Sequence, residues 1–229
     1  MSNACFELYL GDCLEIMKTI PDESVDMIAC DLPYGVTQNR LDVVIPFEPL
    51  WREYERVIKK RGCIALFAQG VFFAELVQSN RKMFRYDLVW DKVLTTGFLN
   101  AGRMPLREHE QIAIFYKKMP EYHPQFTVGA PLHGKGTAYR EKEHKNNNYG
   151  RFHMTDDLRK GSTQKYPTSI VRVPKPHPSV ALHRTEKPAE LLKWLKLLKQ
   201  EEISDIRKVY KSGVSDSVLE TYRNYIRPA

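Results

Sequence analysis

Apolar residues in the first part of the chain, residues 1–118, form short continuous runs that alternate with segments of three- and four-residue apolar spacing. Continuous runs bounded by turn residues are typical of buried strands, and the longer spacing is typical of amphipathic helices. The predicted strands are Phe6–Leu10, Val25–Cys30, Cys63–Phe67, Phe84–Trp90 and Gln111–Tyr116. The predicted helices begin after Asp12, a candidate N-cap, and cover Leu50–Ile58 and Val71–Val77. This order predicts an α/β fold with a mostly parallel sheet and helices on both faces.

The middle segment, residues 119–180, has few aliphatic runs and carries most of the chain's excess positive charge. Between Pro120 and Pro178 there are 10 Lys and Arg residues and 5 Asp and Glu residues, so 10 − 5 gives +5 of the chain's net +7. Basic side chains interleaved with aromatic ones suit contact with phosphates and bases. A surface insertion with ordinary solvated charges explains the same composition equally well. The candidate DNA-binding residues are Arg140, Lys142, Lys145, Arg151, Lys160 and Lys165.

The last segment, residues 181–229, returns to a helical pattern, with Leu191, Leu195 and Leu198 on one stripe. We expect helices here and find no strand-like run in residues 199–212. The predicted organisation is therefore residues 1–118 as the first half of a sheet domain, residues 119–180 as an insertion and residues 181–229 as C-terminal helices.

Charge and composition limit the classes of partner that the protein can be expected to bind. A net charge of +7 favours an anionic partner, either nucleic acid or a membrane surface. No run of about 18 apolar residues exists and the N-terminus lacks a signal pattern, so we expect a cytoplasmic protein with no membrane partner. The four cysteines show no close metal-ligand pair, and no metal site is expected.

The most specific local feature is Asp31-Leu32-Pro33-Tyr34, which ends a predicted buried strand. Ligands of open α/β sheets bind beyond the carboxyl ends of the strands. A carboxylate there could accept the hydrogens of a nucleobase amino group, Pro33 stiffens the turn, and Tyr34 offers a face for an extruded base. A plain turn is the alternative, because Asp and Pro are common turn residues.

Several segments resemble the β-class DNA amino-methyltransferases. Gly11–Gly35 is similar to the opening of that family, with Leu32 in place of a proline of its Asp-Pro-Pro-Tyr motif, a variant associated with adenine-type members of phage and prophage origin. Thr37–Asp42, Asp87–Ala101 and Met104–Glu110 are also similar to that group. His183–Pro188 resembles the family's His-Pro-Thr-Gln-Lys-Pro, with Arg184 and Glu186 departing from it. The resemblance covers residues 5–198 and implies a Rossmann-like methyltransferase sheet with a target-recognition insertion.

The resemblance implies S-adenosylmethionine as cofactor and double-stranded DNA as substrate, outside or within a restriction-modification system. Asp31 and the backbone next to Pro33 would accept the hydrogens of the target amino group, and Tyr34 would stack on the flipped base. Asp12 would contact the cofactor's adenine, and Thr185 and Lys187 would lie near its methionine end. Asp31 rather than Ser favours adenine N6 over cytosine N4, which stays the nearest alternative.

One family element is missing from its expected place. Residues 199–229 contain a single glycine, Gly213, where the family has a glycine-rich Phe-x-Gly-x-Gly loop that approaches the cofactor. The sheet would then be incomplete at its C-terminal half and leave a strand edge that must be covered or paired. The tail could cover it, a second chain could complete it (a homodimer partner or a complementary cofactor-binding subunit), or the protein could be a non-catalytic DNA-binding derivative. RNA as substrate is a further, weaker alternative.

Overall fold

The computed structural model describes residues 8–40, 42–131, 143–153, 161–177, 179, 186–197 and 208–210. The chain divides into two compact units. The first unit combines Met1–His123 with Ser169–Ala229, and the second is Pro124–Thr168. The second unit is therefore an insertion into the first.

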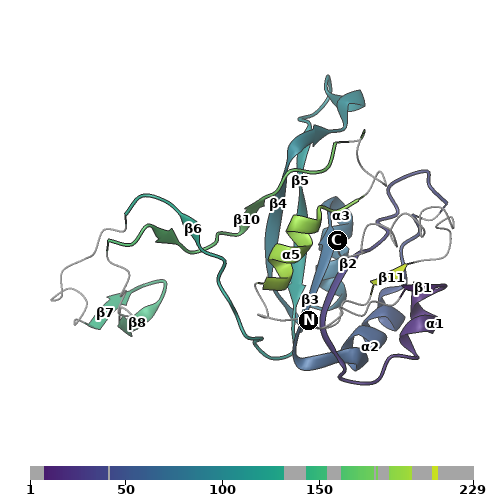
Figure 1. Cartoon of the computed structure of the whole chain (residues 1–229), viewed down its shortest axis with the longest axis horizontal. Coiled ribbons are helices and arrows are strands. Elements are labelled where there is room, and N and C mark those ends of the chain that lie inside the picture. Colours follow the sequence, from purple (N-terminus) through teal and green to yellow (C-terminus); the bar gives the residue numbers. More distant parts are fainter. Residues whose placement is uncertain are drawn as a thin grey trace, which may run out of the picture. The chain divides into compact units, whose positions relative to one another are not determined.

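A five-stranded sheet with the strand order β10-β4-β5-β3-β2 forms the centre of the first unit (Figure 1). Its strands are β2 (Val25–Asp31), β3 (Ile58–Ala68), β4 (Phe84–Thr96), β5 (Arg107–Phe115) and β10 (Ile170–Arg172). The β2–β3 and β10–β4 pairs are parallel, whereas β5 is antiparallel to both β3 and β4. The prediction of an α/β fold with a mostly parallel sheet is confirmed, because β2, β3, β4 and β10 run in the same direction. Of these five strands β5 alone is reversed, since it returns from β4 as a hairpin.

Helices cover both faces of this sheet, as predicted, because side chains alternate along β3. Ile64 and Leu66 face a core shared with α2 (Phe47–Val57) and α3 (Gly70–Ser79). The intervening residues of β3 face a second core, which includes Leu191 and Leu195 of α5 (Ala189–Leu197). In Figure 1, α5 crosses the face of the sheet that is turned to the viewer.

Trp90 anchors the second core. It is completely buried on β4, and its indole Nε1 donates a hydrogen bond of 2.8 Å to the carbonyl of Val173. A buried indole needs such a partner, since an unpaired donor in the core is costly. This bond fixes the segment after β10 against the sheet, which is the segment that leads towards α5.

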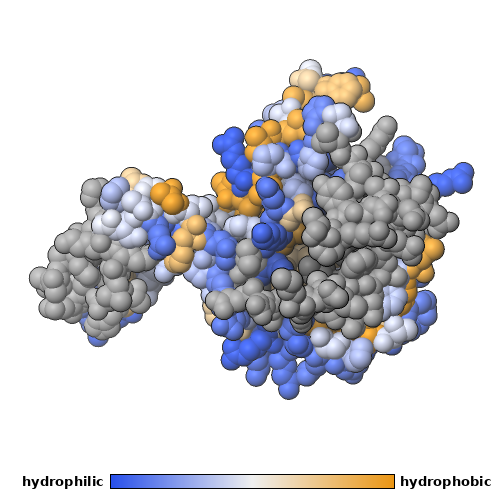
Figure 2. Space-filling view, viewed as in Figure 1, coloured by the Kyte–Doolittle hydropathy of each residue, from blue (hydrophilic) through white to orange (hydrophobic). Residues whose placement is uncertain are grey.

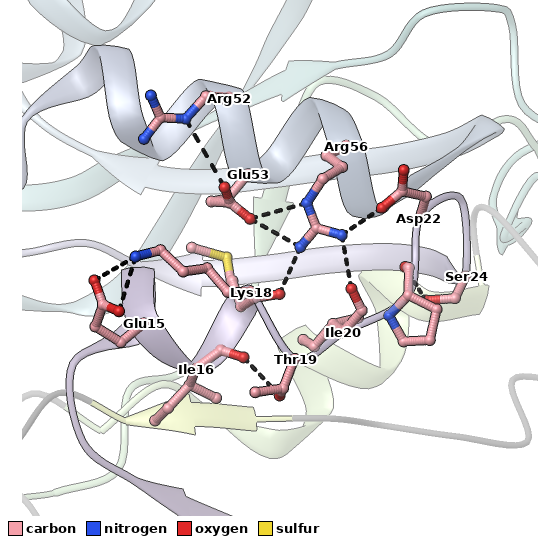
Figure 3. Close-up of polar contacts among 12 residues, drawn as sticks. Glu15, Ile16, Lys18, Thr19, Ile20, Asp22, Ser24, Arg52, Glu53 and Arg56 are labelled. Carbon is pink, nitrogen blue, oxygen red and sulfur yellow. Dashed lines mark hydrogen bonds and ion pairs between the residues drawn. The ribbon is translucent and has the colours of Figure 1, made fainter.

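The short helix α1 (Cys13–Met17) is tied to α2 by the guanidinium of Arg56 (Figure 3). Arg56 donates to the carbonyl oxygens of Met17 (2.6 Å) and Ile20 (2.8 Å) and pairs with the carboxylates of Glu53 and Asp22. Carbonyls at a helix C-terminus lack intrahelical partners, so a cation there stabilises the helix end. Arg56 thus fixes the helix whose N-cap is Asp12.

Strand β1 (Leu8–Leu10) pairs in parallel with β11 (Lys208–Tyr210) in a separate two-stranded sheet. The prediction that residues 199–212 hold no strand is therefore wrong at these three positions. A strand of three residues is too short to show an apolar alternation, so only its pairing reveals it. Within residues 181–229 the described parts are this strand and α5, where only helices were expected.

Beyond Asp91 the β4–β5 hairpin extends past the rest of the sheet. Its register shifts between Asp91 and Thr96, and a short 3-10 turn, η1 (Phe98–Asn100), forms the tip. Phe98 and Leu99 are exposed there, and Figure 2 shows hydrophobic side chains gathered at this tip, at the top of the view. None of the described helices is long and apolar enough to cross a membrane.

The second unit contains two small antiparallel pairs. Strand β6 (Thr127–Val128) pairs with β9 (Gln164–Lys165), and β7 (Glu143–Asn146) pairs with β8 (Gly150–His153). The β7–β8 turn is closed by the side chain of Asn146, which accepts hydrogen bonds from two backbone amides of the turn at 2.9 and 2.7 Å. Asn is a frequent residue at this position because its side chain can replace a backbone acceptor.

Candidate active site

Asp31 is the last residue of β2, and its carboxylate lies at the rim of the sheet. Its Oδ1 accepts a hydrogen bond of 2.9 Å from the Tyr34 hydroxyl, and its Oδ2 lies 3.0 Å from the Lys187 ammonium. The side chain is 31% exposed, so it is not enclosed in the core. A carboxylate offers about four acceptor positions, so it can accept further hydrogens from a ligand.

Lys187 connects Asp31 to a second carboxylate. Its ammonium donates to Oε2 of Glu110 on β5 at 2.9 Å, and Glu110 Oε1 lies 3.5 Å from the ammonium of Lys92 on β4. The three side chains are only 12%, 11% and 4% exposed, in the order Lys187, Glu110 and Lys92. Two carboxylates and two ammonium groups thus form one alternating chain of charges from the rim into the unit.

Burial and the neighbouring charges shift the pKa values of these groups in opposite directions. Desolvation raises the pKa of Asp31, and the attraction of Lys187 offsets this only in part. For Glu110, desolvation also raises the pKa, but Lys187 and Lys92 together bring it below its ordinary value. Burial lowers the pKa of Lys187, and the two carboxylates more than compensate, so its pKa is raised and it stays charged.

Tyr34, the last residue of the motif, connects Asp31 to α3. Its ring stacks on Phe72 of α3, with centroids 5.1 Å apart and an interplanar angle of 27°, while its hydroxyl donates to Asp31. Desolvation, followed by the charge of Asp31, raises the pKa of this phenol, so it remains a donor at neutral pH. Leu32 is buried in the first core and Pro33 is half-buried. The four residues of the motif therefore hold one carboxylate at the rim against a packed turn.

The loop after the motif is organised by Asp42, which sequence reasoning assigned no role. Its carboxylate accepts hydrogen bonds from the backbone amides of Gly35 (2.8 Å), Val36 (3.0 Å) and Thr37 (2.7 Å). Although partial desolvation opposes this, these bonds and one from the Thr37 side chain hold the pKa of Asp42 below its usual value. Gly35 has φ +69°, and an added Cβ would lie 2.9 Å from Val44, so only glycine fits there.

Of the three predicted cofactor residues, the structure describes Asp12 and Lys187, which lie in different surroundings. Asp12 is exposed, follows β1 and caps α1 by accepting from the Leu14 amide at 2.8 Å. An exposed carboxylate can accept a hydrogen bond from a hydroxyl or amino group of a ligand. Lys187 contacts Asp31, and its ammonium lies over the rings of Phe67 and Trp90 at 5.0 and 5.6 Å. Thr185 lies outside the described residues.

Three of the six candidate DNA-binding residues are described, and all three belong to the second unit. Lys145 on β7 and Arg151 on β8 are exposed and directly opposite each other in register. Lys165 on β9 is half-buried, and its stem packs against Gly129. The other three candidates lie outside the described residues: Arg140, Lys142 and Lys160. No cluster of potential metal ligands occurs in the part of the chain that the structure describes.

Comparison with known proteins assigns the chain to a family. The family model described as DNA methylase, of the N6/N4 methyltransferase type, matches residues 25–200, which is more than half of the chain. The chain therefore belongs to this family of DNA methylases. The family includes enzymes that act on adenine N6 and on cytosine N4, so membership does not distinguish the two.

Solved structures agree on the fold. The M1.HpyAVI–SAM complex is similar with a TM-score of 0.55 and 15% identity, covering 97% of this chain and 100% of that one. The PvuII DNA methyltransferase, described as cytosine-N4-specific, is similar with a TM-score of 0.58 and 10% identity, covering 98% of this chain and 93% of that one. These likenesses establish the Rossmann-like methyltransferase fold.

Proposed function

We propose that this protein transfers the methyl group of S-adenosylmethionine to N6 of an adenine that has been flipped out of double-stranded DNA. The observation that carries the proposal is the Asp31 carboxylate, partly exposed at the rim of the sheet and held by Tyr34 and Lys187. Family membership supplies the reaction class, and M1.HpyAVI, which is similar over its full length, was solved with the same cofactor.

Methyl transfer to a nucleobase amino group requires a hydrogen-bond acceptor in the protein and not a covalent nucleophile. The lone pair of a nucleobase amino group is delocalised into the ring, which makes the nitrogen a poor nucleophile. When its hydrogens are accepted by Asp31 and by the backbone carbonyl next to Pro33, the nitrogen moves towards tetrahedral geometry and its lone pair becomes available. The cofactor supplies an electrophilic methyl group, and the proton that the nitrogen releases passes to Asp31 and then to solvent. The protein acts by positioning and by these hydrogen bonds.

Base flipping needs an aromatic face and a rigid rim. Tyr34 is already fixed by Phe72 on one side and by its hydroxyl bond to Asp31. We expect its ring to stack on the extruded base, and the loop that Asp42 holds to form the rim around it. Asp12 is the candidate contact to the cofactor's adenine end. The exposed pair Lys145 and Arg151 is the candidate contact to DNA phosphates.

Adenine is favoured over cytosine because a carboxylate, and not a serine, occupies position 31. The test is to incubate the protein with S-adenosylmethionine and a mixed-sequence duplex, digest the DNA to nucleosides and separate them by liquid chromatography with mass detection. We expect N6-methyladenine. N4-methylcytosine as the sole product would keep the reaction class and reject the base assignment.

A non-catalytic DNA-binding role is the second candidate, and one sequence feature favours it. Residues 199–229 have a single glycine in place of a glycine-rich cofactor loop, and among the described residues β2 pairs only with β3. Titration calorimetry with S-adenosylmethionine separates the two functions. Micromolar binding by the chain alone supports the enzyme, whereas binding only after a second, cofactor-binding chain is added supports a split enzyme. DNA affinity without cofactor binding under either condition supports the DNA-binding derivative.

A further inference from the structure

Glu110 is a buried carboxylate for which neither the motif nor the fold supplies a reason. It lies on β5 opposite Trp90 of β4, next to the second core, to which Trp90 and Ile112 belong. Burying an ionised group is costly, and a buried ion pair rarely stabilises a fold more than apolar residues of the same volume would. A carboxylate retained here therefore points to a function in the site and not only to stability.

Glu110 contacts Lys187 and through it can influence Asp31. Through Oε2 it holds the Lys187 ammonium at 2.9 Å, and the same ammonium lies 3.0 Å from Asp31 Oδ2. The faces of Phe67 and Trp90 enclose the ammonium further. Lys187 is thus clamped between two carboxylates and two rings, and the orientation of Asp31 depends on that clamp.

The clamp also balances charge. Asp31 and Glu110 carry two negative charges, and Lys187 and Lys92 carry two positive ones, so the chain of four groups is neutral. Without Glu110, the same site would contain one unbalanced positive charge. That matters because the cofactor's sulfonium, like any methyl donor, must come within reach of the amino nitrogen that Asp31 grips.

We propose that Glu110 is a positioning residue for methyl transfer, which acts through Lys187 to orient Asp31 and to cancel the ammonium charge where a cationic cofactor must bind. The inference rests on the proposed function. It makes a prediction that a merely structural role would not make, because S-adenosylmethionine is cationic at sulfur whereas S-adenosylhomocysteine is neutral there. The two ligands otherwise differ by one methyl group.

The test is the substitution Glu110→Gln, which keeps the shape of the side chain but removes its charge and replaces one acceptor by a donor. Titration calorimetry of the full chain should show that S-adenosylmethionine binds about tenfold more weakly or worse, since one unbalanced charge in a site of intermediate permittivity has at least this effect. The affinity for S-adenosylhomocysteine should change less than about twofold. The double variant Glu110→Gln with Lys187→Met, which removes both charges, should restore the wild-type ratio of the two affinities.

Glu53→Gln is the matched control, because Glu53 is also a buried glutamate with a basic partner, but on α2. It should leave the ratio of the two affinities unchanged, because any change passed through Arg56 to α1 and Asp12 would affect both ligands alike. Thermal unfolding of every variant checks that the fold persists. An equal loss of both ligands in Glu110→Gln, or no loss of either, would overturn the inference while leaving the proposed function intact. If the wild-type chain binds neither ligand alone, with DNA or with an added cofactor-binding chain, the proposed function and this inference fail together.

Discussion

Replacing Lys187 by Met tests how much the ion pairs of Lys187 with Asp31 and Glu110 contribute to the free energy of unfolding. The side chains have similar lengths, so the substitution removes the ammonium and leaves Asp31 and Glu110 without their shared partner. Removing one member of a buried ion pair usually costs about 3–5 kcal/mol. The Asp31 side chain is 31% exposed, so water can replace part of what it loses there. We therefore expect the lower end, about 3 kcal/mol of the free energy of unfolding near pH 8.

The pH dependence of this loss gives the sharper test. In the wild type the pKa of Glu110 is below its ordinary value of 4.5, so its contribution to stability is complete above that value and is lost as the pH falls through the folded-state pKa. Lys187→Met removes the largest attraction on both carboxylates and leaves desolvation, which raises both pKa values. Protonation then removes the uncompensated negative charges. The loss in free energy of unfolding, relative to the wild type, should therefore shrink as the pH falls from 8 to 5.

Urea denaturation followed by circular dichroism at several pH values measures both effects. Lys59→Met is the matched control, because Lys59 pairs with Asp26 at 2.7 Å with side chains 46% and 37% exposed. Such a surface pair should contribute less than about 1 kcal/mol. The reasoning is refuted if Lys187→Met costs no more than this control, or if its deficit is the same at pH 5 as at pH 8.

Three further predictions concern the loop and the DNA contacts. Asp42→Asn should reduce methyl transfer at least tenfold and stability by about 1–3 kcal/mol, because an amide cannot hold three backbone donors as a carboxylate does; Asp26→Asn is the control, and equal activity of the two variants would contradict the role of Asp42. Gly35→Ala should cost about 1–2 kcal/mol from its left-handed backbone alone, with more from the clash, in a urea titration; an unchanged midpoint would show that the turn can relax. Lys145→Ala and Arg151→Ala should each lower the slope of log affinity against log salt concentration by about 0.9 in fluorescence-anisotropy titrations, and unchanged slopes would remove both from the phosphate contacts.

Much of the fold could be predicted from local patterns. The buried run at Cys63–Phe67 and the three-residue spacing of Trp51, Tyr54 and Val57 correctly indicated β3 and α2, because burial on one or two faces leaves a periodic pattern. The reversed direction of β5 was not predictable in this way, since a hairpin and a crossover leave the same pattern in the strands that they join. The three-residue strands β10 and β11 have no detectable period and form only through their partners.

The site residues that are close together in the sequence could also be predicted, whereas those far apart could not. Asp31 and Tyr34 are three residues apart and could be recognised as one motif, whereas Glu110 and Lys187 are separated by 77 positions in the sequence. No local pattern marks such a pair. Glu110 directly precedes the apolar run Gln111–Tyr116, but Arg107 and Glu108 are close by in the sequence, so Glu110 resembles the end of a polar stretch and not a buried group. Lys187 was connected with the site only through family resemblance, which suggested a cofactor contact and not the contact with Asp31.

The most direct test of the central claim is a comparison of DNA methylation and DNA affinity in the single variant Asp31→Asn. An amide keeps the size of the side chain but replaces one acceptor by a donor, so it can no longer accept both the existing bonds and the hydrogens of the base. We predict that transfer of radiolabelled methyl groups to duplex DNA is abolished while the affinity for the same duplex stays within about twofold of the wild type. Methylation by Asp31→Asn at a wild-type rate would contradict the account, because the carboxylate would then not be the group that grips the base.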